Sequence, residues 1–214
     1  PINIRKKVFK DIKQITAKRE FLRNKNHMLM GILNLTPDSF SDGGKFNSVR
    51  KANKRIKNMI EAGADIIDVG GESSRPGSKI IPEETELKRV KDVIKKFKTK
   101  YSKTLMSIDT RKSMIMDFAI NHNVDIVNDV SCFKFDPRSI ETIKNKKLWK
   151  IIHHMQGTPQ NMQINPKYHN VLLDIYDFFE REIKKLEKFK FRKKIILDPG
   201  IGFGKNLKHN LMIL

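Results

Sequence analysis

The sequence predicts an α/β protein in which strands and helices alternate along the chain and the strands form a parallel sheet. Three observations support this fold class. Short apolar runs of strand length recur, and stretches with apolar residues at helical spacing follow them. Most of the apolar runs end on a polar residue that opens a loop, and glycine or proline marks many of the boundaries. Alternation of this kind is typical of right-handed βαβ units, which place parallel strands side by side.

The strands are predicted where apolar residues run together over strand length. Three of these runs finish on Asp, a fourth is followed by His153, and the first, with Asn34 near its end, opens into the loop TPDSFSDGG. Proline, glycine and short polar residues in that loop favour turns over regular structure. The six predicted strands span residues 30–35, 64–71, 104–109, 124–129, 148–152 and 194–198.

The helices are predicted from apolar residues spaced three or four apart and from capping residues. Ser48 can cap the first helix, which ends at Gly63, and Pro82 opens the second. Asp136 is expected to cap a short helix whose first residue is Pro137. Further helices are predicted at 112–122 and 168–189, and a last one begins before Leu214.

Length and composition indicate a single domain over residues 1–214, because 38% hydrophobic residues suffice for a core. Residues 1–27 are expected to form an N-terminal hairpin or a plug below a barrel. The basic N-terminus lacks the apolar segment of a signal peptide, and no apolar run reaches the roughly 18 residues of a membrane span. The single Cys132 excludes an internal disulfide. We therefore predict a cytoplasmic protein without membrane contact.

The chain is strongly basic, with 44 Lys and Arg against 24 Asp and Glu and a net charge of +20. Such a charge can attract nucleic acid or another polyanion. However, the lysines are spread over most of the predicted helices instead of forming one patch. We interpret them as a solvated coat and expect no nucleic-acid partner.

Polar residues at the strand ends mark the expected site, because the carboxyl ends of parallel strands meet at one edge of the sheet. Both a doubly wound sheet and a (β/α) barrel place their sites at this edge. No G-x-G-x-x-G motif opens a helix after the first strand, which disfavours a dinucleotide-binding fold. The polar residues at this edge are Asn34, Glu72, Asp109, Asn128, His153, His154 and Asp198.

Six segments of the chain, MGILNLTPDSFSDGG, IIDVGGESSRPG, SIDT, IVND, HHMQG and LDPGIGFGKN, resemble the dihydropteroate synthase family in order and spacing. The resemblance covers nearly the whole chain. It implies a (β/α)8 TIM barrel, of which about the first six βα units lie here, so that the domain is expected to be incomplete at its C-terminus. The implied reaction, in folate biosynthesis, joins 6-hydroxymethyl-7,8-dihydropterin diphosphate to p-aminobenzoate, giving 7,8-dihydropteroate and diphosphate.

The resemblance also implies roles for individual residues at the pterin end of the site. A carboxylate can accept two parallel hydrogen bonds from the amidine-like edge of a pterin. The family assigns this edge to Asp198 with Asn128, and places Asp109 against the reduced ring. Asp109, Asp198 and Asp38 are the candidate catalytic residues, since carboxylates stabilise positive charge on the pterin methylene as diphosphate leaves. Ser74 would contact the pterin diphosphate through its hydroxyl.

The second substrate and the metal are assigned in the same way. Phe40, Arg75 and Pro76 would form the p-aminobenzoate pocket, on loops that fold over the site once diphosphate and Mg²⁺ are bound. Asn34 would contribute to the Mg²⁺ and diphosphate site, because Mg²⁺ prefers oxygen ligands and often binds through substrate phosphates. Taken singly, each of these residues also fits an ordinary turn or strand end. The family further implies a homodimer.

Two histidines and a glycine-rich loop need separate interpretation. His153 and His154 resemble a metal pair, but adjacent residues of a strand point to opposite faces. His153 stands where the family usually has methionine, near the pterin pocket. The loop PGIGFGK lacks the spacing of a nucleotide-binding P-loop, so we interpret it as a loop that positions Asp198.

Of three alternative functions, only the first stays open beside the synthase. The first is a decayed barrel that holds pterin or diphosphate without turnover, because the lysine and Arg-x-His motifs of the family's last two strands do not occur before Leu214. The second is a methyltetrahydrofolate-dependent methyltransferase, which the loops TPDSFSDGG and ESSRPG disfavour. The third is nucleic-acid binding, which needs clustered lysines.

Overall fold

A computed structural model describes residues 27–36, 45–75, 77–189 and 194–214 of the chain. Six strands in these ranges form one sheet in strict chain order, each paired in parallel with the next. The strands are β1 (Met30–Asn34), β2 (Ile66–Gly70), β3 (Leu105–Asp109), β4 (Ile126–Asp129), β5 (Trp149–His153) and β6 (Ile195–Asp198). The predicted hairpin or plug at 1–27 lies outside the described ranges except for its last residue.

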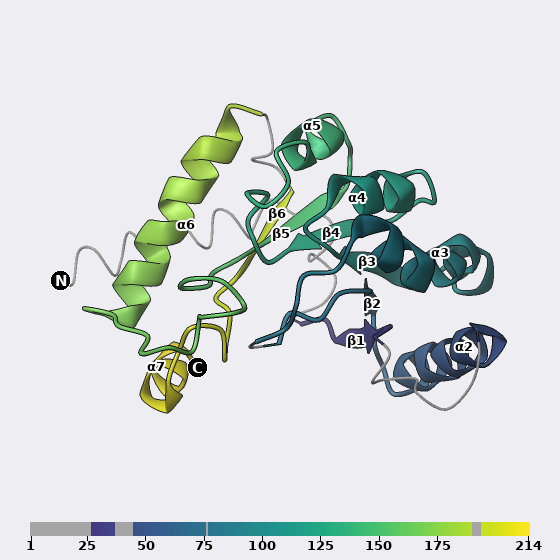
Figure 1. Ribbon diagram of the computed structural model, residues 1–214, viewed down its shortest axis with the longest axis horizontal. Coiled ribbons are helices and arrows are strands. Elements are labelled where there is room, and N and C mark those ends of the chain that lie inside the picture. Colours follow the sequence, from purple (N-terminus) through teal and green to yellow (C-terminus); the bar gives the residue numbers. More distant parts are fainter. Residues whose placement is uncertain (1–26, 37–44, 76, 190–193) are drawn as a thin grey trace.

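A helix follows every strand, and the helices lie along the outside of the sheet from α2 round to α6 (Figure 1). They are α2 (Lys45–Glu61), α3 (Glu83–Lys100), α4 (Ser113–Ile120), α5 (Ser139–Ile143), α6 (Val171–Glu187) and α7 (Leu207–Ile213). A doubly wound sheet reverses its strand order at a switch point, whereas a barrel keeps chain order. The predicted α/β class, with six βα units of the barrel type, is therefore confirmed.

Two predicted helix starts are wrong. Helix α2 begins at Lys45, so that Ser48 lies inside the helix instead of capping it. Helix α5 begins only at Ser139, and Asp136–Pro137 therefore does not form its start. Both predictions used only the residue types near the expected helix start, and these do not fix where the helix begins.

Asp136 caps a different helix. Its Oδ2 accepts a hydrogen bond from the backbone N–H of Ser113, the first residue of α4, at 2.9 Å. Its Oδ1 accepts a second bond from the backbone N–H of Arg138 at 2.9 Å. The contact with Ser113 crosses 23 residues of sequence, so a local capping pattern cannot reveal it.

The main core lies between the helices and the outer face of the sheet. Alternate strand residues point toward the helices and are almost wholly buried, as the two-residue period of a strand requires. These outer-face residues include Leu33, Ile67, Val69, Met106, Ile108, Val127 and Ile152. Burial of such apolar side chains is the dominant stabilising term of the fold.

A smaller apolar cluster occupies the inner face of the sheet. Ile66, Ile126, Trp149 and Ile151 form it, with Met28, Met30, Leu105 and Ile196 packed against them. Most of these residues lie toward the amino ends of their strands. The carboxyl half of the inner face is consequently left to polar side chains.

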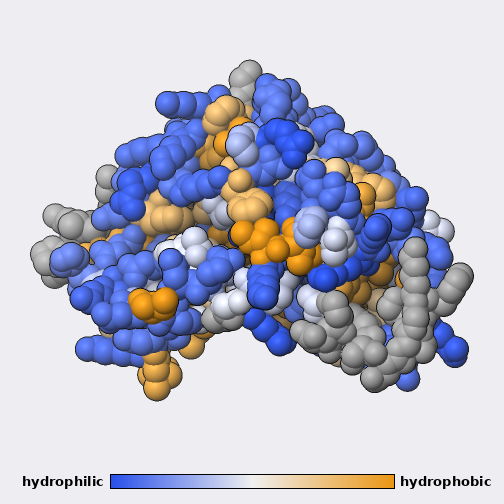
Figure 2. Space-filling view, viewed as in Figure 1, coloured by the Kyte–Doolittle hydropathy of each residue, from blue (hydrophilic) through white to orange (hydrophobic). Residues whose placement is uncertain are grey.

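The outer surface is mostly hydrophilic, with small apolar patches on the face shown in Figure 2. No helix in the described parts of the chain is long and apolar enough to cross a bilayer.

Candidate active site

The strand register brings several predicted site residues to one level of the sheet. Asn34 of β1 is the register partner of Gly70, which pairs with Asp109, which in turn pairs with Asn128. Residues at one level of a parallel sheet point to the same face. Asn34, Asp109 and Asn128 therefore share the inner face at the carboxyl edge.

A glycine separates two of these side chains. Asn34 Oδ1 and Asp109 Oδ2 lie 3.5 and 3.4 Å from the point where a Cβ on Gly70 would stand. Gly70 thus leaves an open position between an amide oxygen and a carboxylate oxygen. Oxygen donors of this kind suit a hard cation such as Mg²⁺. Within the described ranges, no three His, Cys, Asp or Glu residues are grouped closely enough to hold a metal ion. Mg²⁺ commonly completes its shell with water and substrate phosphate oxygens.

Asp68 is a site residue that the sequence analysis missed. It lies in the middle of β2, is 3% exposed, and accepts a hydrogen bond from Asn128 Nδ2 at 3.0 Å. This bond crosses from β2 to β4 over the inner face of β3, which is possible because the sheet curves. The available signal was an Asp two residues before Gly70 in an otherwise apolar strand.

Burial raises the pKa of Asp68, and the charge of Asp198 adds to the increase, while the Ser107 hydroxyl and the Asn128 amide oppose it. Burial also raises the pKa of Asp109 well above its usual range, and the charge of Asp68 is the next largest cause. Both carboxyl groups thus retain a proton more readily than an exposed aspartate does. The two carboxyl groups lie on the same face of the sheet, so the charge of one raises the pKa of the other.

Several buried polar atoms on this face have no hydrogen-bond partner within the described part of the chain. They are Asp68 Oδ1, Ser107 Oγ, Asn128 Oδ1 and His153 Nδ1. Buried polar atoms in native proteins are nearly always paired, so a group of unpaired ones indicates a place where a ligand supplies the partners. The acceptors among them match a ligand with an N–H-bearing edge.

Asp198 ends β6 beside His153, its register partner on β5. Its Oδ1 accepts a hydrogen bond from the backbone N–H of Gly200 at 2.8 Å, and its Oδ2 lies 3.9 Å from His153 Nε2. Burial lowers the pKa of His153, and Lys205 lowers it further, while Asp198 opposes the shift. The imidazole is therefore neutral near pH 7 and faces the Asp198 carboxylate.

The two histidines point to opposite sides of β5, as adjacent strand residues must. His154 Nδ1 lies 2.9 Å from the Nζ of Lys205, which also donates to the carbonyl of Phe203 at 2.8 Å. Lys205 has only donors, so His154 Nδ1 is the acceptor of this bond. This buried contact ties the glycine-rich loop to the end of β5.

Gly200 explains part of the glycine requirement in that loop. Its φ is +69°, and a Cβ there would lie 2.0 Å from the backbone oxygen of His154. Only glycine fits this position, which lets the loop fold tightly under Asp198. The contacts of Gly200 and Lys205 agree with the interpretation of PGIGFGK as a positioning loop.

The β2–α3 loop brings Ser74 to the same edge. A shallow cavity there is lined by Glu72, Ser73, Ser74, Asp109, Thr110, Arg111, Val130 and Pro159. Ser74 and Asp109, from neighbouring strand ends, therefore share one cavity. Arg75 is exposed and does not line it. Asp38, Phe40 and Pro76 lie outside the described residues.

The comparisons with known proteins agree with this geometry. A family model described as pterin binding enzyme matches residues 30–214. Dihydropteroate synthase of Haemophilus influenzae is 40% identical over 187 residues, covering 87% of this chain and 67% of that protein. The Escherichia coli K12 synthase is 42% identical over 187 residues, covering 87% and 66%.

Solved structures agree as well. A Yersinia pestis dihydropteroate synthase bound to a sulfonamide drug superposes with a TM-score of 0.80 at 38% identity, covering 87% of this chain and 67% of that one. A Clostridium difficile synthase crystallised with pteroic acid gives a TM-score of 0.79 at 40% identity, covering 88% and 70%. The chain therefore belongs to the pterin-binding enzyme family. The members of that family that it matches are dihydropteroate synthases, and it spans about two thirds of their length.

Proposed function

We propose that the protein acts as a dihydropteroate synthase, a transferase that joins 6-hydroxymethyl-7,8-dihydropterin diphosphate to p-aminobenzoate and releases diphosphate. The observation that carries this proposal is the set of unpaired buried acceptors on the inner face, beside Asp109 and Asp198. A pterin offers a row of N–H donors that such acceptors recognise. The similarity to synthases crystallised with pteroate or sulfonamide ligands supports the same reading.

Each inner-face side chain has a role in this proposal. Asp198 and Asn128 bind the pyrimidine edge of the pterin, and Asp68 holds the Asn128 amide in place through its 3.0 Å hydrogen bond. Asp109 faces the reduced ring. As diphosphate leaves, positive charge develops on the pterin methylene, and Asp109, Asp198 and Asp38 stabilise it in their ionised form.

The diphosphate end is assigned to the opposite side of the cavity. The Ser74 hydroxyl donates to the diphosphate, and Asn34 contributes an oxygen to Mg²⁺, which supplies positive charge to the phosphates when bound. Phe40, Arg75 and Pro76 form the p-aminobenzoate pocket. A homodimer, a cytoplasmic location and the absence of a nucleic-acid partner remain predictions from the sequence.

Titration of the protein with the pterin diphosphate and Mg²⁺, beside an assay for dihydropteroate, tests the proposal. We expect both binding and product. Binding without product identifies a pterin-binding barrel that has lost catalysis, and absence of binding overturns the proposal altogether.

The assignment of the pterin edge is tested by Asp198→Asn. Loss of a charged acceptor costs about 1.5–3 kcal/mol, so the Kd for the pterin should rise about 10- to 100-fold while the fold is kept. Asp117→Asn, at an exposed position on α4, is the matched control and should leave the Kd unchanged. Equal Kd values for Asp198→Asn and the wild type would show that another residue binds this edge.

A further inference from the structure

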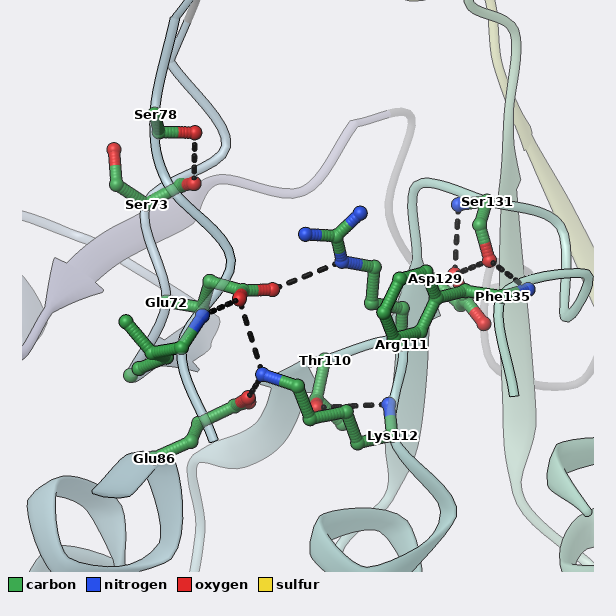
Figure 3. A network of polar contacts seen from close by, with 12 residues as sticks. Glu72, Ser73, Ser78, Glu86, Thr110, Arg111, Lys112, Asp129, Ser131 and Phe135 are labelled. Atoms are coloured by element: carbon green, nitrogen blue, oxygen red, sulfur yellow. Dashed lines mark hydrogen bonds and ion pairs between the residues drawn. The ribbon is translucent and has the colours of Figure 1, made fainter. Parts of the chain in front are cut away.

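Four charged residues form a network at the base of the β2–α3 loop (Figure 3). Glu72, at the start of this loop, accepts hydrogen bonds from Arg111 Nε at 2.9 Å and from Lys112 Nζ at 3.0 Å. The Lys112 ammonium reaches between two carboxylates, because it also donates to Glu86 Oε2 at 2.6 Å. The two positive and two negative charges come from the end of β2, the first turn of α3 and the β3–α4 loop.

The network is shielded from water. The side chains of Lys112 and Glu86 are 6% and 0% exposed, and that of Glu72 is 9% exposed. Within the described ranges Lys112 is the one cation that contacts Glu86, whose Oε1 has no hydrogen-bond partner there. Burying charges is costly, and apolar residues of similar volume often stabilise a fold equally well. The network instead fixes the geometry of the loop above it.

Glu72 fixes the base of the loop. Its Oε1 also accepts a hydrogen bond from the backbone N–H of Ile81 at 2.9 Å, which joins the start of the loop to its end. Burial alone would raise the pKa of Glu72, but the bonds from Arg111, Ile81 and Lys112 outweigh it and lower the pKa. Glu72 thus stays ionised and keeps these contacts at neutral pH.

Helix α3 provides the surface on which the base rests. A Cβ on Gly71 would lie 2.8 Å from Val90 Cγ1 and 2.9 Å from Glu86 Cγ, so the backbone runs directly against the helix. Arg89 Nη1 donates to the Gly71 carbonyl at 2.7 Å. The loop therefore begins at Glu72, beside α3, and ends at Ile81, just before α3 starts. Ser74 lies between these two ends.

Arg111 joins this base to the cavity. Its guanidinium carbon lies 4.2 Å from the centre of the Phe135 ring, and the residue lines the cavity together with Ser74 and Asp109. The tip of the loop has contacts of its own: Gly77 N donates to the Pro159 carbonyl at 3.0 Å, Ser78 Oγ to the Ser73 carbonyl at 2.6 Å, and Gln160 Nε2 to the Ser78 carbonyl at 3.1 Å. The charges at the base fix the end of the loop from which Ser74 follows.

We propose that Lys112 is a positioning residue that acts through Glu72 to hold Ser74 beside Asp109. This inference rests on the proposed function, in which Ser74 contacts the diphosphate of the pterin substrate. Lys112 lies outside the cavity lining and contacts neither substrate. Its effect is selective: it sets the affinity for a ligand that carries a diphosphate, and the pterin ring itself is bound by other residues.

Lys112→Met, in the protein expressed from its complete gene, tests this selectivity. Loss of the loop geometry should raise the Kd for the dihydropterin diphosphate with Mg²⁺ about tenfold or more. The Kd for 6-hydroxymethylpterin, which lacks the diphosphate, should change less than about twofold. Lys112→Arg can still bridge both carboxylates and should restore most of the diphosphate affinity.

A second variant separates positioning from stability. Lys112→Met leaves Glu86 buried without a counter-charge, whereas Lys112→Met with Glu86→Gln removes that charge. The double variant should recover the Tm but not the diphosphate affinity. Lys98→Met, which breaks the ion pair with Asp125 near the amino edge of the sheet, is the control and should leave both Kd values unchanged. Recovery of affinity together with the Tm, or equal weakening of both ligands, overturns the inference.

Hydrogen exchange provides a test that does not depend on pterin binding. In Lys112→Met the backbone amides of residues 72–75 and 77–81, that of Ile81 above all, should exchange faster, while the strand amides stay protected. Unchanged exchange in the loop overturns the positioning role. A wild-type protein that binds no pterin, but whose loop is loosened by this substitution, would overturn the proposed function and leave the positioning role intact.

Discussion

The two faces of the sheet are built from alternate residues of the same strands, and they bury different chemistry. The outer face places Val69, Met106 and Ile108 against the helices, all at most 1% exposed. The inner face, one residue along on the same strands, carries Asp68 and Asp109 toward its carboxyl end. Because successive side chains of a strand point to opposite faces, the apolar and the polar residues stay on separate sides of the sheet.

The difference shows where stability and function reside. On the outer side Asp136 has both carboxyl oxygens paired, with bonds from Ser113 and Arg138, whereas Glu86 Oε1 and Ser139 Oγ have no partner in the described ranges. On the inner face Asp68 and Asn128 retain buried oxygens without partners in the described ranges. A sheet optimised for stability alone would carry paired or apolar groups there. On the proposed function, the inner face keeps these unpaired groups for binding at some cost in stability, as functional sites commonly do.

The largest effect should come from the outer face. Ile67 on β2 is 0% exposed, and Ile67→Ala leaves a cavity among residues that cannot fully collapse. We expect the free energy of unfolding to fall by about 2–5 kcal/mol, measured by urea denaturation. Pterin affinity of the folded variant should stay within about twofold of the wild type, because the side chain points away from the site.

Ile32 on β1 is the matched control for this experiment. It lies on the inner face, pairs in register with Asp68, and is 48% exposed. Ile32→Ala should cost less than about 1 kcal/mol of stability, since little apolar area is lost from the core. It should instead weaken pterin binding, because Ile32 offers an apolar wall beside the acceptors. If the two variants lose equal stability, the division between the faces is wrong.

Asp136 tests the same comparison with a carboxylate. Burial would raise the pKa of Asp136, but the bonds from Arg138 and Ser113 outweigh it and hold the pKa well below its usual range. Asp136→Ala removes the cap of α4 and should lower the free energy of unfolding by about 1–3 kcal/mol at pH 7. Pterin affinity should not change, because this residue lies on the helix side.

The pH dependence follows from the direction of that shift. A carboxyl group whose pKa is depressed by folding stabilises the protein above its unfolded pKa, and this contribution is lost as pH falls. The difference between the wild type and Asp136→Ala should thus be full at pH 6 and shrink below about pH 4. Asp136→Asn, which keeps one acceptor, should show an intermediate loss. A difference that grows toward acid would contradict the assignment.

Much of the fold could be predicted because its signals are local. Apolar runs and helical spacing located all six strands, and strand ends placed Asp109, Asn128 and Asp198 at one edge of the sheet. The opposite directions of His153 and His154 also follow from the strand period alone. These features need only neighbouring residues in the sequence.

What could not be predicted depends on contacts across the sheet. In the sequence, Asp68 is only a polar residue inside an apolar strand. Its role depends on the bond to Asn128, which lies 60 residues away. Glu72 was recognised as a polar strand end, but its partner Lys112 lies 40 residues on and belongs to a different loop. Asp136 was assigned to the wrong helix for the same reason. Pairing partners are set by the register of the sheet, which single-sequence patterns do not contain.

The smallest expected effect, and the sharpest contrast, concerns Asp68. Because burial raises its pKa, the ionised group costs stability that an uncharged side chain would not. Asp68→Asn keeps an acceptor for Asn128 and should raise the free energy of unfolding on the order of 1 kcal/mol at pH 8. A raised pKa favours the folded state at low pH, so this gain should vanish below about pH 4. Pterin affinity should fall.

A substitution at Asp129 shows whether the stability gained by Asp68→Asn comes from the unpaired inner face or from burial alone. It is 0% exposed, and burial raises its pKa to about 6, yet its oxygens accept bonds from Ser131 and from the backbone N–H of Phe133. Asp129→Asn puts an amide donor against one of these donors and should lower stability, opposite in sign to Asp68→Asn. If both variants gain stability, burial alone accounts for the effect. If only Asp68→Asn gains it while losing pterin affinity, the unpaired inner face is what the protein retains for binding.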